Sequence, residues 1–224
     1  MRLRNYYYIF LLLLCFQSVA QVKTIQAVKT LQAPRIDGEL NDAVWKEAPV
    51  LSDFIQNSPS PGSKSSSNTE VRILYDNSAI YVGAYLFDDP ALIRKQFTAR
   101  DGEQMRDVDY FSVFFDTYND KQNGFQFLVT TANVQTDARV SPTYSGEFGS
   151  YGDKTWDAVW ESKVSIHKDG WVVEMRIPYV SLRFSKKEVQ DWGLQLLRFT
   201  RRNNETDFWN PISPQVNGFA NQFG

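Results

Sequence analysis

The side chains that most often carry chemistry are scarce in this sequence. His167 is the only histidine and Cys15 the only cysteine among 224 residues. A Ser-His-Asp or Cys-His site would need His167 as its base. Because Val164 and Ile166 put the apolar side of this segment at every second position, His167 is expected on the solvent face of an ordinary strand. Nucleophilic catalysis and transition-metal binding are therefore poor interpretations.

Carboxylates are plentiful, with 26 Asp and Glu residues, but no pair stands out for glycoside hydrolysis. We therefore expect no catalytic role for this portion of the chain. Two clusters of acidic residues are dense enough to suggest structural calcium, which needs about six to eight oxygen ligands. The candidates are Asp101, Asp107, Asp109, Asp116 and Asp120. Ordinary turns also attract Asp and Asn for backbone reasons, and this remains the alternative.

The N-terminal segment has the pattern of a signal peptide. Arg2 and Arg4 precede an apolar run from Ile9 to Phe16, and Ala20 ends a small-residue cleavage pattern. We expect residues 1–20 to be removed on export, with a retained N-terminal anchor as the alternative. The segment has no acidic residue, so its loss changes the formal net charge from −2 to −4. No clustered basic face indicates a nucleic-acid partner.

Short strand-like runs dominate the exported part, and residues 21–33 read as a polar lead-in segment. Residues 42–47 are expected to form a short helix, whereas 57–69 and 141–155 are loops by composition. Strands are expected within 71–75, 80–87, 109–116, 125–129, 164–166, 171–177, 194–199 and 206–209. Evenly spaced strands with almost no helix predict an all-β, antiparallel β-sandwich over residues 34–224.

Four blocks give a specific family resemblance. They read PRIDGELNDAVWKEA, VRILYDNSAIYVGAYLFDDP, DVDYFSVFFDT and DGWVVEMRIPYVSL. Their order and content are similar to family 9 carbohydrate-binding modules. Together with WDAVWES and RRNNETDFWNPI, they resemble the N-terminal domain of large two-domain secreted proteins of Bacteroidetes-type bacteria, whose C-terminal β-domain is thought to lie at the outer membrane. The resemblance implies that the closing strand of the sandwich would follow Gly224.

The resemblance also implies a sugar site, since such modules clamp a sugar end between two tryptophans. A pyranose packs its apolar face on an aromatic ring and hydrogen-bonds planar polar groups through its hydroxyls. The first clamp position falls on Arg106, and the second falls on Phe219. The polar contacts of the family fall on Ser112 and Leu128. The scaffold is thus expected to be kept while most of the sugar clamp is lost.

The remaining tryptophans provide other ring candidates. Trp209, with Asn210 beside it near the last loop, is the leading candidate for a sugar platform. Trp156 lies at a loop end and is either a ligand contact or a packing residue. Trp45 and Trp171 lie on apolar faces and are expected in the core.

Three functions remain open at this point. The first is a non-catalytic carbohydrate-binding module of an exported polysaccharide-processing system, binding a carbohydrate or a cell-surface glycan. Any glycoside hydrolase activity would then lie in a C-terminal part. The second is a scaffold that supports a larger C-terminal β-domain without binding sugar. The third is a protein-interaction module at the outer membrane. The expected location is the periplasm, the outer membrane or the extracellular space.

Overall fold

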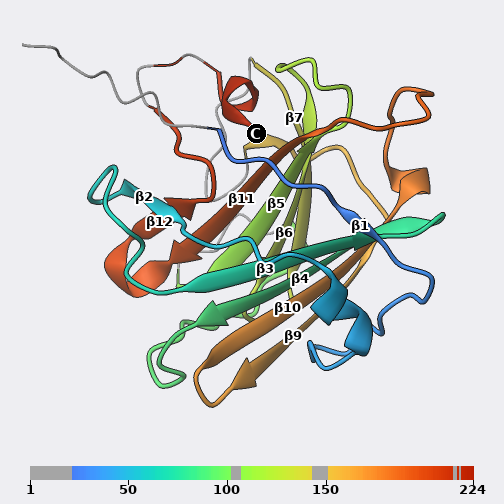
Figure 1. Cartoon of the computed structure of the whole chain (residues 1–224). Coiled ribbons are helices and arrows are strands. Elements are labelled where there is room, and N and C mark those ends of the chain that lie inside the picture. The colour runs from blue at the N-terminus through green and yellow to red at the C-terminus, as the bar shows by residue number, and fades with distance from the viewer. Residues whose placement is uncertain (1–21, 102–106, 143–150, 214–215, 217) are drawn as a thin grey trace, which may run out of the picture.

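A computed structural model of the chain describes residues 22–101, 107–142, 151–213, 216 and 218–224 (Figure 1). Residues 1–20 and Arg106 lie outside the described residues. The signal peptide and the role of Arg106 therefore stay predictions.

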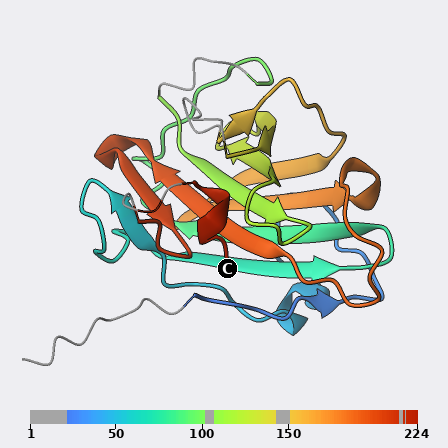
Figure 2. The ribbon, with the colours of Figure 1, turned by 90° about the horizontal axis from the view of Figure 1, so that it is seen from above.

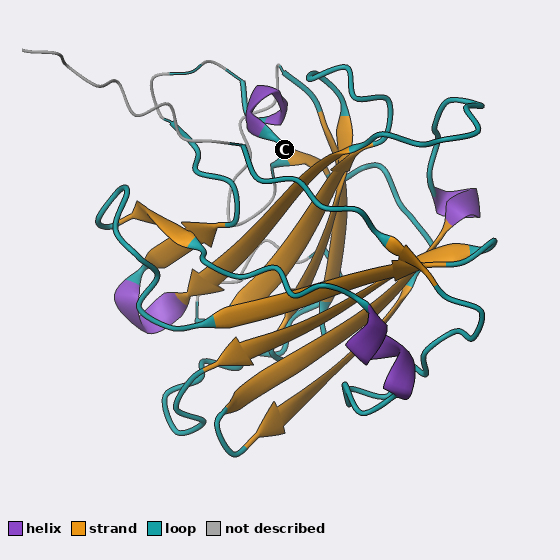
Figure 3. Ribbon diagram, in the orientation of Figure 1, coloured by secondary structure: helices purple, strands orange, loops and turns teal. Residues whose placement is uncertain are grey.

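The described residues form two mainly antiparallel sheets, and the prediction of an all-β sandwich is confirmed (Figure 3). Sheet A has the order β1 (Val28–Lys29), β3 (Thr69–Tyr75), β4 (Ala79–Phe87), β10 (Gly170–Pro178) and β9 (Glu161–His167). Sheet B has the order β2 (Ile55–Ser58), β12 (Glu205–Phe208), β11 (Gly193–Thr200), β5 (Tyr110–Asp116), β6 (Gly124–Thr130), β7 (Gln135–Val140) and β8 (Gly152–Asp153). Strands β1 and β3 are parallel, unlike the other pairs.

Helical structure is limited to short 3-10 turns. These are η1 (Ala43–Glu47), η2 (Tyr179–Ser181), η3 (Arg201–Asn203) and η4 (Ala220–Gln222). Figure 2 shows η1 and the segment before it lying against the outer side of sheet A. Among the described residues, no helix is both long and apolar enough to cross a membrane.

Alternating apolar residues build the main core between the sheets. On β5, Phe111, Val113 and Phe115 face inward, while the residues between them face the outside of sheet B. Trp171 of β10 lies in this core, at 1% exposure, as its alternation predicts. Ile166 of β9 is 41% exposed although its phase is inward. The reason is that β9 is the edge strand of sheet A, where sheet B covers less.

A second hydrophobic cluster covers the outer face of sheet A. Trp45 of η1 is 1% exposed and packs there with the N-terminal segment. The carboxylate of Glu174 fixes this segment by accepting hydrogen bonds from the amides of Asp37 at 2.9 Å and Gly38 at 2.7 Å. It also accepts the indole N–H of Trp45 at 3.0 Å. Two sequence blocks separated by more than 100 residues are thus joined at one carboxylate.

The end of the chain contacts β11. Gly224 donates to Leu194 at 3.1 Å and accepts from it at 2.7 Å, both through the backbone. The closing strand expected after Gly224 stays a prediction.

Candidate functional site

The predicted ring contacts lie on opposite faces of sheet B. Trp156 is half-buried and packs on Phe125 and Phe127, with ring centroids 4.8 and 6.0 Å away, on the side of the main core. Phe219 packs on Phe114, which faces the other side of β5. Because sheet B lies between the two rings, a single sugar cannot contact both.

Trp209 and Asn210 both make contacts within the fold. The ring of Trp209 is 4% exposed and belongs to the main core. Asn210 accepts the amide of Lys23 at 2.7 Å and donates to its carbonyl at 3.3 Å. The side chain of Gln195 also bonds both backbone groups of Asn210, at 2.9 Å each. Trp209 is therefore a core residue and not the exposed platform that the sequence suggested, because the strand phase turns its ring inward.

Phe219 belongs to an aromatic cluster on the outer face of sheet B, which we call the outer cluster. Its ring stacks on Tyr151 at 4.4 Å between centroids with an interplanar angle of 25°. The ring centroids of Phe208 and Phe223 lie 5.7 and 5.0 Å from that of Phe219. Tyr151 and Phe219 are half-buried, and burial raises the pKa of the Tyr151 phenol to about 12. Both rings thus present partly covered, uncharged surfaces at physiological pH.

The two positions at which the resemblance implies polar sugar contacts are buried beneath this cluster. Ser112 and Leu128 are both 0% exposed. The hydroxyl of Ser112 accepts the side-chain amide of Gln126 at 3.1 Å, and the carbonyl of that side chain accepts the amide of Tyr151 at 2.7 Å. These groups satisfy one another and leave nothing for a ligand at this depth.

Four of the five calcium candidates accept backbone amides with their carboxylates. Asp109 accepts the amides of Arg201 at 2.6 Å and Arg94 at 2.9 Å. Asp116 accepts the amide of Lys121 at 2.7 Å, and Asp120 accepts the amide of Asn123 at 2.8 Å.

Asp101 accepts the amide of Asp137 at 3.3 Å, and Asp107 lies 3.9 Å from Arg94. In the described part of the chain, no three His, Cys, Asp or Glu side chains are placed to hold a metal ion. Calcium binding stays a prediction.

A buried charged network closes one end of the sandwich. Arg198 of sheet B is 1% exposed and donates a hydrogen bond at 3.1 Å to Asp88, which follows β4 of sheet A. Arg202 bonds the same carboxylate at 2.8 Å. Burial raises the pKa of Asp207 to about 7, and the Glu205 carboxylate adds to the shift. Arg198 and Arg202, near the end of β11, are thus paired internally through Asp88.

Sequence reasoning missed most of the outer cluster. Tyr110 and Phe199 form a second stacked pair, 4.8 Å apart, on the same face as Phe114. Burial raises the pKa of Tyr110 as well. The alternation of β5 could have indicated this face, since Tyr110 and Phe114 are four residues apart and point the same way.

Comparison with known proteins agrees with this architecture. The sequence profile of the carbohydrate family 9 binding domain-like family matches residues 36–219. The chain belongs to this family. A family 9 module of Caldicellulosiruptor kristjanssonii, solved in complex with cellotriose, has a TM-score of 0.61 at 20% identity, covering 88% of this chain and 90% of that chain. The same kind of module was also solved with glucose, with a TM-score of 0.60 at 19% identity over 89% and 93% of the two chains.

Two further proteins are similar to this chain, one a solved structure and one a much longer enzyme. A protein of Bacteroides uniformis, described as a candidate carbohydrate-binding protein, has a TM-score of 0.68 at 12% identity, covering 91% of this chain and 98% of that chain. Endo-1,4-beta-xylanase C of Paenibacillus barcinonensis is 23% identical over 163 residues. These residues are 73% of this chain but 13% of the enzyme. The family resemblance is confirmed, and the two-domain Bacteroidetes context stays a prediction.

Proposed function

We propose that this domain is a non-catalytic carbohydrate-binding module of an exported polysaccharide-processing system. The observation that carries the proposal is the family match over residues 36–219. Relatives solved with cellotriose and glucose, and a relative within a xylanase, support the ligand class. Export rests on the signal-like residues 1–20, and any glycoside hydrolase activity would belong to a C-terminal part of a longer protein.

The rim of the outer cluster is the site that we propose for this activity. Phe219 and Tyr151 are stacked and half-buried there, so their accessible edges form a small apolar platform. Arg106, which precedes β5 in the sequence, would add planar hydrogen-bond donors to this rim. A platform of this kind without a second clamping ring should bind weakly, with dissociation constants on the order of micromolar to millimolar.

A glycan array with the secreted chain, followed by calorimetry, tests the proposal. Phe219→Leu keeps most of the apolar packing and removes the ring, so it should weaken binding at least several-fold at a nearly unchanged melting temperature. Phe97→Leu is the matched control, because its ring is 76% exposed and lies outside the outer cluster. Equal affinity of the Phe219→Leu variant and the wild type would exclude this rim. An array with no bound glycan would exclude the function.

A scaffold or protein-interaction role is the second candidate, supporting a larger C-terminal domain at the outer membrane. The specific observation in its favour is the closed outer cluster, where Ser112 and Leu128 are fully covered. A domain that only supports a partner needs such packing and no open clamp. An empty glycan array, together with stable association of a C-terminal β-domain, would favour this role.

A further inference from the structure

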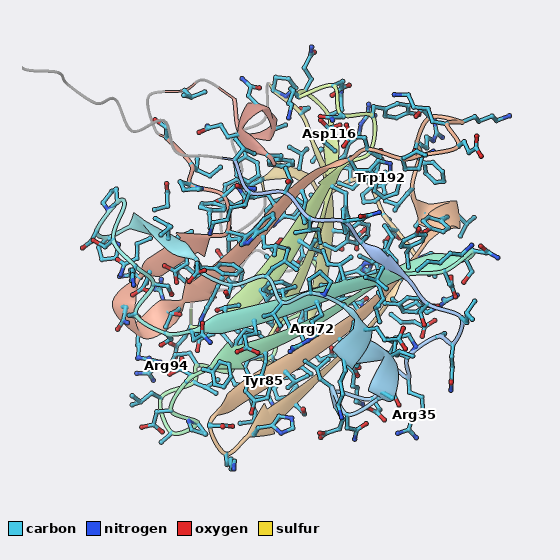
Figure 4. All side chains as sticks on the ribbon, in the orientation of Figure 1. Arg35, Arg72, Tyr85, Arg94, Asp116 and Trp192 are labelled. Atoms are coloured by element: carbon cyan, nitrogen blue, oxygen red, sulfur yellow. The ribbon has the colours of Figure 1, made fainter. Side chains whose placement is uncertain are left out.

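A separate hollow of about 400 Å³ lies on the outer face of sheet A, on the opposite side of the sandwich from the outer cluster. Tyr85 and Phe87 of β4 and His167 of β9 contribute rings to it, and Arg72 and Glu70 of β3 contribute charged groups. Figure 4 labels Tyr85 and Arg72, which extend from neighbouring strands of this face. The volume lies within the range of small-ligand sites, roughly 300–1,000 Å³.

The walls of the hollow are fixed by packing. Gly83 of β4 pairs with Arg72 of β3, and its missing side chain lets Leu40 and Trp45 approach the sheet. A Cβ at Gly83 would lie 2.6 Å from Leu40. Because Glu174 holds the indole of Trp45 at 3.0 Å, this wall is anchored to the sheet and does not depend on a ligand.

The rings form a continuous apolar surface along the ends of β4 and β9. The ring centroid of Tyr85 lies 4.6 Å from that of Phe87 and 5.7 Å from that of His167. The hydroxyl of Tyr85 donates to Asp169, which fixes the ring across the β9–β10 turn. Burial raises the pKa of Tyr85 to about 12, so the ring stays neutral.

The polar rim has unused hydrogen-bonding capacity and balanced charge. Within the described part of the chain, the guanidinium of Arg72 has one ion-pair contact, to Glu70 at 3.8 Å, and no hydrogen bond. Glu39 lies 3.7 Å from the His167 ring. The hollow is lined by two carboxylates, of Glu39 and Glu70, and two cations, of Lys46 and Arg72. With a neutral imidazole, its formal charge is therefore zero.

We propose that this hollow is a second carbohydrate-binding site, which takes a neutral pyranose. The apolar face of the sugar packs on Tyr85, and its hydroxyls bond the guanidinium of Arg72 and the carboxylate of Glu70. Balanced charge provides no net attraction for an acidic sugar or a phosphate, whereas carboxylates and donors together suit hydroxyls, which both donate and accept. The site shares its ligand class with the proposed function but not its residues.

The single histidine makes this site directly observable. In the secreted chain labelled with ¹³C in the histidine ring, one ring resonance set reports on His167. The probes are cellotriose, xylotriose, mannotriose and galactotriose, with trigalacturonate as the acidic counter-probe. We expect a saturable shift of the His167 signals with at least one neutral trisaccharide, and affinity at least five-fold lower for trigalacturonate.

Two variants and two matched controls locate the effect. Tyr85→Ala and Arg72→Met should each weaken the binding that shifts His167 at least five-fold. Tyr118→Ala, at a tyrosine 48% exposed in the β5–β6 turn, and Arg35→Met, at an arginine 72% exposed, should leave it unchanged. Arg72→Met keeps the aliphatic stem and guards against a folding artefact at Tyr85.

The outcomes separate the two proposals. A His167 signal that no neutral trisaccharide shifts overturns this site, even where calorimetry detects binding that Phe219→Leu abolishes. Equal affinity of the Tyr85→Ala and Arg72→Met variants and the wild type overturns it as well. Binding that both variants weaken and Phe219→Leu leaves intact supports this site and contradicts the one at the outer cluster.

Discussion

Replacing Glu174 by glutamine should release the segment that covers the outer face of sheet A. Glu174 is 0% exposed, and four donors reach its carboxylate. One oxygen accepts the amides of residues 37–39 at 2.7–3.2 Å, and the other accepts the indole of Trp45 at 3.0 Å. Glutamine keeps a single carbonyl oxygen and places an amide N–H₂ where the second oxygen was.

The magnitude follows from counting these contacts. With its carbonyl toward the three backbone amides, glutamine leaves the buried indole facing another donor, which costs about 1–3 kcal/mol. The three remaining bonds lose the strength that a charged acceptor gives, about 1 kcal/mol each at most. Water can reach the partly exposed amides and reduces this part, and a neutral side chain also avoids the desolvation that raises the pKa of Glu174. We expect a net loss of about 1–4 kcal/mol from a native stability of about 5–15 kcal/mol.

Urea unfolding followed by tryptophan fluorescence measures the loss as a shift in midpoint at constant slope. Glu161→Gln is the matched control, since Glu161 is 60% exposed and pairs with Arg176 on the same face. Its effect should stay below about 1 kcal/mol. A double-mutant cycle of Glu174→Gln with Trp45→Phe should give a coupling of at least about 0.5 kcal/mol. A Glu174→Gln variant as stable as Glu161→Gln would refute the anchoring role.

Three further outcomes follow from other buried groups. Because burial raises the pKa of Asp207 from 3.8 to about 7, ionising this group lowers native stability as the pH rises from about 4 to 7. The melting temperature of the Asp207→Asn variant should therefore exceed that of the wild type by more at pH 8 than at pH 5. An equal difference at the two pH values would contradict this. Trp209→Ala should cost about 3–5 kcal/mol in urea unfolding, as a core tryptophan does, and a loss below about 1 kcal/mol would contradict its core placement. If calcium binds, it should raise the melting temperature relative to EDTA, whereas an unchanged melting temperature would exclude the ion and leave Asp116 and Asp120 as acceptors of backbone amides.

Alternation and turn chemistry were sufficient to predict most strands. The apolar phase of β5 and β10 and the turn at Asp169-Gly170 carry their own local signals. Strand β7 was missed because its sequence, Gln135–Val140, is largely polar. Its buried Asp137 accepts the indole of Trp160 at 3.0 Å and the amide of Ala158 at 2.7 Å, so the strand depends on tertiary partners. No local pattern can show such partners.

The candidate sites depend even more than the strands on contacts that no local sequence pattern shows. Phe219 was found through the family resemblance, but its stacking on Tyr151 joins two loops far apart in sequence. The hollow on sheet A was not predicted, because it depends on the pairing of β4 with the distant strand β10, which brings His167 of β9 to this face, and on the packing of Trp45 against Gly83. His167 was correctly expected on an outer face, yet its solvent-facing phase also made it part of this hollow. Register between distant strands is set by packing, which a single sequence does not display.

Calorimetric titration of the purified protein with the neutral oligosaccharides selected on a glycan array tests the carbohydrate-binding function most directly. We expect saturable heats with dissociation constants on the order of micromolar to millimolar, weakened several-fold by Phe219→Leu, by Tyr85→Ala or by both. Heats indistinguishable from dilution for every neutral oligosaccharide, from a chain that melts cooperatively, would show that the domain does not bind carbohydrate.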